Sequence, residues 1–290
     1  MEEQLSLLPL DSPLRGSVKN ERFVMVYNFF ALTKERRTDP IVYQDGNVKI
    51  EVKSGADGIA TIYDKEFLIY VASLLVDKIN RGLEPTQTCT ITGNDYFRVT
   101  RQDNNKKSYE RLALTLERLQ GTQVKTNIET GGEGQDEWFS WLKSAKTQYR
   151  KLPDGGRELK SITIEICDWL YRAIVKDSRM LTYDPAFFDL PPLEKRLYEI
   201  ARAHCGNQAG FKINLEKLRL RVGSEDQAKN FKAKLIKKSA QKNVIPEYGF
   251  KVVDRTEPGR RADPKKALVV FWRLERWRDY NVDEFGEVEA

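Results

Sequence analysis

The stretch CTITGNDYFRVTRQDNNKKSYERLALTLERLQG, residues 89–121, decides the fold. It begins strand-like, and Thr92 or Asn94 can then cap a short helix over 95–99. Apolar side chains recur every three or four residues over 105–120, which predicts a longer helix that ends at the following glycine. A short helix, a turn and a longer helix in this order are typical of a helix-turn-helix.

The flanking segments extend this unit to a winged helix-turn-helix. Before it, helical spacing predicts a helix over 63–80 with Asp64 at its N-cap, and the Asp45-Gly46 turn predicts a hairpin over 41–52. After it come three strand-like runs, which the turn-forming segments TGGEGQ and PDGG separate: 122–129, 136–149 and 157–166. We expect these three strands to form a β-meander beside the helices.

The second half repeats this order in shorter form. Helices are predicted over 192–204, 215–222 and 225–241, and strands over 211–213, 249–254 and 267–274. The letters IT…RV at 91–99 also match IN…RV at 213–222, a weak similarity at the same place in both units. We therefore predict an α+β fold of two tandem winged helix-turn-helix domains.

Four parts are expected along the chain. Residues 1–19 read as a flexible tail. The first winged-helix domain is predicted over 20–180 and the second over 181–275, because prolines interrupt helix formation in the linker between them. An acidic tail follows over 276–290.

Basic charge is concentrated toward the C-terminus. The formal net charge is +6, yet residues 1–210 hold 30 basic and 30 acidic side chains. Residues 211–273 hold 17 Lys and Arg against 7 Asp and Glu, and residues 274–290 hold 2 against 6. A basic segment of this kind indicates a polyanionic partner such as nucleic acid, and an ordinary solvated face is the alternative.

The helix predicted over 105–120 has an apolar and a basic side. Its expected core stripe consists of Tyr109, Leu112, Ala113, Leu116 and Leu119. A basic stripe on the opposite side fits the major groove of DNA, although basic residues on an exposed helix can serve solubility alone. The DNA-binding candidates of the first domain are Arg98, Arg101, Lys106, Lys107, Arg111 and Arg118.

The second domain carries two basic elements, a helix over 225–241 and a loop over 256–267. Lysines suit phosphates, so Gln227 and Asn230 are the better candidates for reading base edges. A basic loop between two strands can lie along the DNA backbone as a wing. The candidates here are Arg219, Arg221, Gln227, Lys229, Asn230, Lys232, Lys234, Lys237, Lys238, Arg260, Arg261, Lys265 and Lys266.

The residues that catalysis or metal binding would need are scarce. The sequence has no GxxxxGK[ST] phosphate loop, its single histidine is His204, and its three cysteines form no CxxC pair. We therefore expect no enzyme activity, no metal and no cofactor. No apolar run is long enough to span a membrane and the N-terminus lacks a basic signal region, so we expect a cytoplasmic protein.

A short motif stands in the N-terminal tail. Gln4, Leu5, Leu7 and Leu8 resemble the bacterial sliding-clamp-binding pentapeptide, in which a glutamine and spaced apolar residues fill a pocket. Packing of the tail on its own domain is the alternative.

Longer segments resemble the replication initiator protein A family of plasmids. They cover about 15–275 and keep the family's order and spacing: FFALTKERRTDPIVYQDGNVKIEV (29–52), GIATIYDKEFLIYVAS (58–73), YERLALTLERLQGTQVKTNI (109–128), FSWL (139–142), DWLYRAI (168–174), TYDPAFFDL (182–190) and LEKRLYEIARAHCGNQAGFKINLEKL (193–218). The tail from about 276 has no counterpart in the resemblance.

The resemblance implies an iteron-binding initiator with tandem winged helices. Such a protein binds repeated double-stranded sites at a plasmid origin, promotes melting of a neighbouring AT-rich stretch, and recruits the host helicase and chromosomal initiator. It also implies a homodimer that represses, with the first domain as the dimerisation surface. A transcriptional repressor with no replication role is the main alternative, and a DNA-processing enzyme is a third.

Overall fold

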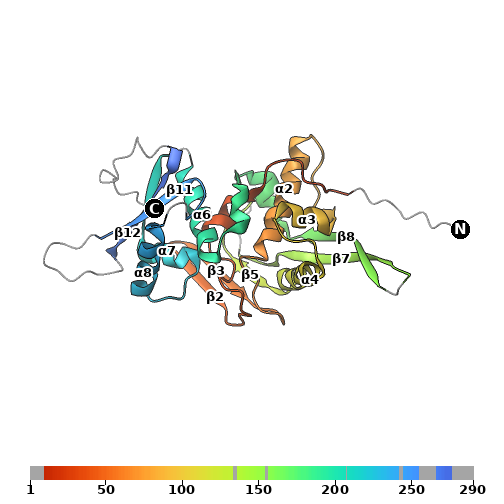
Figure 1. Cartoon of the computed structure of the whole chain (residues 1–290), viewed down its shortest axis with the longest axis horizontal. Helices are drawn as coiled ribbons and strands as arrows, with labels where there is room; N and C mark the ends of the chain where they lie inside the picture. Colours follow the sequence, from red (N-terminus) through yellow and green to blue (C-terminus); the bar gives the residue numbers. More distant parts are fainter. Residues whose placement is uncertain are drawn as a thin grey trace.

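The computed structural model describes residues 10–132, 136–153, 156–206, 208–241, 244–254 and 266–275. Figure 1 shows an elongated molecule in which α6, α7, α8, β11 and β12 gather at one end, and α2, α3, α4, β7 and β8 at the other. The helices of the described ranges are α1 (Arg22–Val26), α2 (Lys65–Asn80), α3 (Gly93–Val99), α4 (Lys106–Gly121), α5 (Asp168–Arg172), the π-helical η1 (Ala173–Asp177), the 3₁₀ turn η2 (Pro185–Asp189), α6 (Pro192–Cys205), α7 (Leu215–Val222) and α8 (Ala228–Ser239).

The strands form small antiparallel sheets. Their bounds are β1 (Lys19–Glu21), β2 (Ile41–Asp45), β3 (Val48–Lys53), β4 (Thr88–Ile91), β5 (Gln123–Thr126), β6 (Glu137–Ser140), β7 (Leu142–Lys151), β8 (Arg157–Ile166), β9 (Met180–Thr182), β10 (Gly210–Asn214), β11 (Tyr248–Val253) and β12 (Leu268–Arg273). The sheet orders are β1-β9, β2-β3-β5-β6, β4-β8-β7 and β10-β12-β11.

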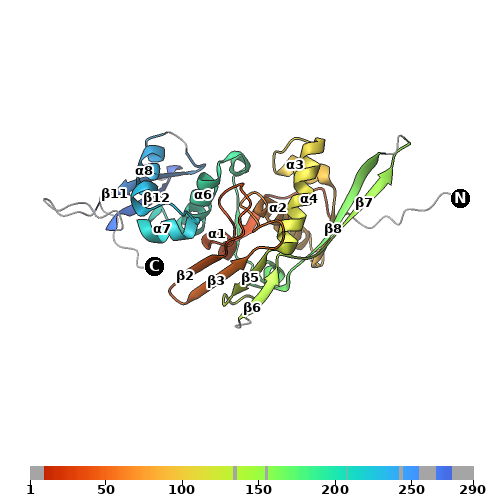
Figure 2. The same cartoon turned by 90° about the horizontal axis from the view of Figure 1, so that it is seen from below.

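Two winged-helix modules stand in tandem, as the sequence predicts. In the first module, α2, α3 and α4 pack with the sheet β4-β8-β7, whose hairpin β7–β8 projects from the body (Figure 2). In the second, α6, α7 and α8 pack with β10-β12-β11. The same order of helix, strand, two helices and hairpin occurs in both, so the α+β class and the tandem architecture are confirmed.

The predicted β-meander is wrong, because the chain changes sheets at Trp141. The run expected as one strand over 136–149 divides into β6, which pairs with β5, and β7, which pairs with β8. Trp141 lies between them and is fully buried, with its ring stacked on Phe30 at a centroid distance of 5.0 Å. Burial of this large ring bends the chain into the core. The hairpin β2–β3 joins β5 and β6 in a sheet that the sequence analysis does not foresee.

The helix predicted over 225–241 is shorter in the structure. It begins as α8 at Ala228, because residues 223–227 form a turn. Gly223 adopts a left-handed φ of +76° at the end of α7, a conformation that costs glycine little. Arg219 then donates to the carbonyls of Ser224 and Asp226 at 3.1 and 3.2 Å and holds the turn in place.

The buried apolar residues form two clusters. The first includes α2, α4 and the sheets around Trp141, and the second includes α6, α7 and α8. Elements of the N-terminal half contribute to both, because Val24 lies in the first cluster whereas Met25, Val26 and Ile69 lie in the second. The division into domains at 180 and 181 therefore remains a prediction.

Buried ion pairs join the two clusters. Lys65 at the start of α2 contacts Glu199 of α6 at 2.6 Å, and neither side chain is exposed. Glu66 contacts Lys195 at 2.9 Å in the same interface. Arg196 contacts Glu199 at 2.5 Å and also donates to backbone carbonyls of both halves. These ion pairs therefore connect α2 of the first module directly to α6 of the second.

Within the described ranges, no helix combines the length and the apolarity that crossing a lipid bilayer requires.

Candidate nucleic-acid interface

The second long helix, α8, has an anchored side and a cationic side. Phe231 and Leu235 are fully buried and hold the helix against the second core. The exposed positions include Lys229, Asn230, Lys234 and Lys237, which recur at helical spacing and share the outward face. Lys234 reaches Asp226 at 2.6 Å but keeps 55% of its side chain exposed. Gln227 is exposed at the N-cap of the helix.

Two other lysines of α8 lie at its flanks and are ion-paired. Lys232 contacts Asp254 after β11, and only 12% of its side chain is exposed. Lys238 contacts Glu194 at the start of α6 and is 28% exposed. All lysines of this helix look alike in sequence, whereas the structure separates an outward group from an ion-paired group at the flanks.

The arginines of α7 serve the fold, and for Arg221 this corrects the sequence analysis. Arg221 is 7% exposed and contacts Asp45 of β2 at 2.9 Å, so it joins the two modules and is not presented to DNA. Arg219 pairs with Glu216 one turn earlier and holds the turn before α8. Burial of a guanidinium is tolerable only where a carboxylate and hydrogen-bond acceptors meet it, which explains this arrangement.

The first long helix, α4, exposes cations in its first two turns. Asn105 caps it by accepting from the Ser108 amide at 3.0 Å, as a good N-cap residue does. Lys106, Lys107 and Arg111 are exposed. Leu112, Leu116 and Leu119 are buried as predicted, and Tyr109 is half-buried. Ala113 is exposed, contrary to the prediction, and Thr115 takes the buried position.

Thr115 and Arg118 both bind the buried carboxylate of Asp64, so Arg118 is not part of the exposed basic stripe. Arg118 donates to both carboxylate oxygens of Asp64 at 2.7 and 2.6 Å, and Thr115 donates to the same carboxylate at 2.7 Å. Asp64 is fully buried and occupies the predicted N-cap position of α2, but its side chain makes no capping hydrogen bond there. The assignment of Arg118 to DNA is corrected, because its guanidinium neutralises a buried carboxylate.

Arg98 and Arg101 flank the turn between α3 and α4. Arg98 pairs with Asp95 at 2.5 Å, and Arg101 pairs with Asp189 of η2 at 2.5 Å. About half of each side chain stays exposed, at 58% and 48%. Both remain predicted DNA contacts, at the periphery of the helix-turn-helix.

Both long helices lie on one side of the molecule. Figure 1 places α4 and α8 along the same lower edge, and Figure 2 shows both from that side. Each of these two helices, one from each module, carries exposed cations.

The hairpin β7–β8 adds basic residues that the sequence analysis does not select. Lys146, Arg150 and Lys151 of β7 are exposed. A sequence feature that could have identified this hairpin is the run of ten mostly polar residues LKSAKTQYRK. Such a run is too polar for a core strand and is typical of a projecting wing.

Part of the predicted surface falls outside the described residues. Arg260, Arg261 and Lys265 of the second wing and Gln4, Leu5, Leu7 and Leu8 of the tail motif belong to this group. Lys266 is described and exposed at the end of the second wing.

The three cysteines are buried, and the single histidine is partly buried. Burial raises the pKa of the Cys89, Cys167 and Cys205 thiols to about 12, so they stay protonated at neutral pH. Among the described residues, no group of three or more His, Cys, Asp or Glu side chains could hold a metal ion. His204 stacks on Phe211 and contacts Arg221 at 2.8 Å.

The single histidine permits a direct pH test. Burial, and then the charge of Arg221, lower the pKa of His204 from 6.5 to about 3. We expect its imidazole NMR signal to keep one chemical shift from pH 8 to pH 5. The unfolded chain binds a proton that the folded chain does not, so this group should reduce stability as the pH falls from 6.5 toward 3. A titration midpoint near 6.5 would contradict the buried position.

Two sequence comparisons match this chain to known proteins. The family model "Replication initiator protein A" matches residues 19–250. A protein of Wigglesworthia glossinidia brevipalpis, whose name refers to replication, is 37% identical over 239 residues, which cover 81% of this chain and 85% of that protein.

Two solved structures of RctB are similar to this chain in fold. A structure of domains 2 and 3 of RctB superposes with a TM-score of 0.60 at 14% identity, covering 86% of this chain and 97% of that one. A second RctB structure of the same domains gives a TM-score of 0.54 at 13% identity, with 88% and 97% covered. The Pi initiator protein in complex with iteron DNA gives 0.48 at 16% identity, with 73% and 90% covered.

Proposed function

Since the chain belongs to the replication initiator protein A family, we propose that it initiates plasmid replication by gripping repeated duplex sites at the origin with both modules. The observation that carries this proposal is the placement of α4 and α8 on one side, each with exposed cations. Each helix would enter a major groove, and successive grooves on one DNA face lie about 34 Å apart.

The exposed residues divide by chemistry into backbone and base contacts. Lys107, Lys229 and Lys237 would bind phosphates, which supplies affinity without sequence preference. Asn230 can make two hydrogen bonds to a base edge, so it is the proposed sequence-reading residue. The β7–β8 hairpin and the basic loop of the second domain would act as wings along the backbone.

Further steps of initiation belong to the same proposal. Binding at the origin would promote melting of a neighbouring AT-rich stretch and recruit the host helicase and chromosomal initiator. The motif from Gln4 to Leu8 would bind the sliding clamp as an extended peptide. The protein would work in the cytoplasm by binding rather than by catalysis, with a homodimer formed through the first domain as the repressing state.

Complementation in trans tests the function. A plasmid that carries the cognate repeats but lacks this gene should replicate only in cells that express the protein. The repeats can first be located by footprinting the protein on the DNA upstream of its own gene. Replication without the protein would contradict the proposal.

The repressor alternative makes a different prediction in the same experiment. A protein that footprints its own upstream DNA and lowers transcription there, but never supports replication in trans, would be an autoregulator only.

A further inference from the structure

The segment between α1 and β2 lies between the two DNA-facing helices. On one side, Leu32, Thr33 and residues 35–39 line a cavity of about 570 Å³ with Lys234 of α8 and the turn that precedes it. On the other side, Lys34 lines a cavity of about 490 Å³ with Arg111 and Leu114 of α4. The segment therefore occupies the centre of the side that carries both helices.

Backbone and side-chain contacts hold this segment in place. Ala31 donates to the carbonyl of Ala60 at 2.9 Å, and Ile59 donates to the carbonyl of Arg37 at 2.8 Å. Arg37 also pairs with Glu225 in the turn before α8. Because the segment is held at Ala31 and at Arg37, the exposed Lys34 between them has a fixed position.

Gly58 permits the close approach of the segment to the first module. It has a φ of +89°, and a Cβ atom there would lie 2.9 Å from Cγ of Arg36 and 3.0 Å from the carbonyl oxygen of Arg37. A larger residue would push the segment outward, so the position of Lys34 is built into the fold.

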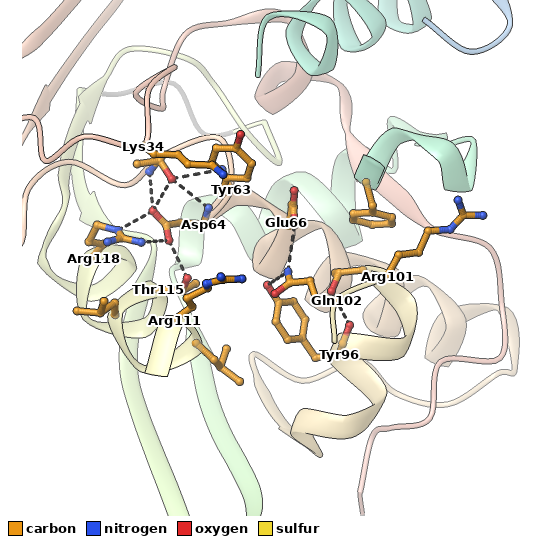
Figure 3. A pocket seen from close by; sticks show the side chains of 15 residues that line it. Lys34, Tyr63, Asp64, Glu66, Tyr96, Arg101, Gln102, Arg111, Thr115 and Arg118 are labelled. Atoms are coloured by element: carbon orange, nitrogen blue, oxygen red, sulfur yellow. Dashed lines mark hydrogen bonds and ion pairs between the residues drawn. The ribbon is translucent and has the colours of Figure 1, made fainter. Parts of the chain in front are cut away.

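The charges around the 490 Å³ cavity leave two cations without a carboxylate partner (Figure 3). Of its acidic residues, Asp64 is neutralised by Arg118 and Glu66 by Lys195. Lys34 and Arg111 are exposed and form no ion pair with any residue that the structure describes.

Other charges nearby are already paired or face elsewhere. Arg101 lines the same cavity but pairs with Asp189 at 2.5 Å. The carboxylates of the segment, Glu35 and Asp39, line the other cavity beside α8. Lys34 places its Nζ 4.7 Å from the centroid of the Tyr63 ring, which orients the ammonium without neutralising it.

We propose that Lys34 and Arg111 form a phosphate-binding site between the segment and α4. In the bound complex the site would take a backbone phosphate of the duplex, at the centre of the interface between the two major-groove contacts. The inference rests on the proposed function, because it assigns a third point of contact on the same DNA. It adds Lys34, a residue that neither long helix supplies.

A salt titration of duplex binding tests this site. Each phosphate contact adds about 0.9 to the slope of log affinity against log salt. We expect Lys34→Ala with Arg111→Ala to lower that slope by about 0.9, the contribution of one phosphate contact, and to weaken binding at 0.1 M salt by roughly tenfold. Lys34→Arg with the native Arg111 should keep the native slope, because the charge remains.

A matched control removes the same charge from the opposite end of α2. Arg81 forms an ion pair with Asp77 at this end of the helix. Arg15 lies nearby in the fold, because the next residue, Gly16, contacts the same Asp77 side chain. The 16 residues of α2 make a helix about 24 Å long, and the cavity lies at its other end. Arg15→Ala with Arg81→Ala should therefore leave the slope unchanged, although the net charge falls equally.

The outcomes separate this site from the function itself. If the native protein binds its repeats and the Lys34 and Arg111 double variant keeps the native slope, the site is wrong and the function stands. If the native protein shows no preference for its repeats, the proposed function fails first. A calorimetric titration with inorganic phosphate distinguishes the source: tight binding of free phosphate with an unchanged DNA slope would overturn the DNA role.

Discussion

Replacement of Glu199 by glutamine is expected to lower the free energy of unfolding by about 3–5 kcal/mol, the usual cost of removing one partner from a buried ion pair. Glu199 is fully buried and accepts from Lys65 at 2.6 Å, from Arg196 at 2.5 Å and from the Tyr183 hydroxyl at 2.7 Å. Glutamine keeps the shape but removes the charge that both cations need. Equilibrium urea denaturation would measure the loss.

The protonation state of Lys65 explains why the free energy of unfolding should fall by this much. Burial lowers the pKa of Lys65 to about 7, and the charge of Glu199 opposes that shift. Without the carboxylate, the ammonium is disfavoured at neutral pH, and its bond to the Val24 carbonyl at 2.7 Å weakens. The variant should therefore loosen the contact between α2 and α6 and, with it, the relative position of α4 and α8.

Two comparison variants make the result specific. Lys65→Met should cost less than Glu199→Gln, because Glu199 keeps Arg196 and Tyr183 as partners. Glu51→Gln removes the partner of Lys53 in an exposed pair at 3.1 Å and should cost under about 0.5 kcal/mol. If Glu199→Gln costs no more than Glu51→Gln, water reaches the cluster and the buried pairs do not hold the modules.

Removal of the outward lysines of α8 should have the largest effect on DNA binding. We expect the triple variant Lys229→Ala, Lys234→Ala and Lys237→Ala to lower the salt slope by about 3 and to weaken duplex binding at 0.1 M salt by roughly 500-fold. All three side chains are exposed on one face, and Phe231 and Leu235 keep the helix packed. Fluorescence anisotropy over a salt series gives both quantities.

Lys232→Ala is the matched control on the same helix. This side chain is 12% exposed and paired with Asp254, so its loss should leave the salt slope unchanged. A slope that falls equally for Lys232→Ala and for Lys237→Ala would mean that the free protein rearranges on DNA and that the ion pair opens.

Local pattern alone was enough to predict the longer helices of both modules and the tandem order, but not the short helices α1 and α5. The helix over 105–120 and the one over 215–222 match α4 and α7 closely, because their apolar periodicity, caps and terminal glycines act within a few residues. The Asp45-Gly46 turn likewise predicts the hairpin of β2 and β3. Resemblance to the initiator family then led to a function that the family comparison supports.

Local pattern could not predict which cations remain available to a ligand. Arg118 and Lys107 look alike on a helical projection, but Arg118 meets Asp64, 54 residues earlier in the chain. Arg221 meets Asp45 across 176 residues, and Lys34 lies beside α4 only because the segment is held against Gly58. Such partners are set by packing, which no local spacing encodes.

The amino-acid sequence by itself determined the two winged-helix units and the family, since hydrophobic period, capping and turn chemistry depend on neighbouring residues. Only the tertiary structure decided how the strands divide at Trp141. It also decided which cations form ion pairs with buried carboxylates and how α2 and α6 contact each other. The physical reason is that a buried charge must find its partner wherever the fold places one, however distant in the chain.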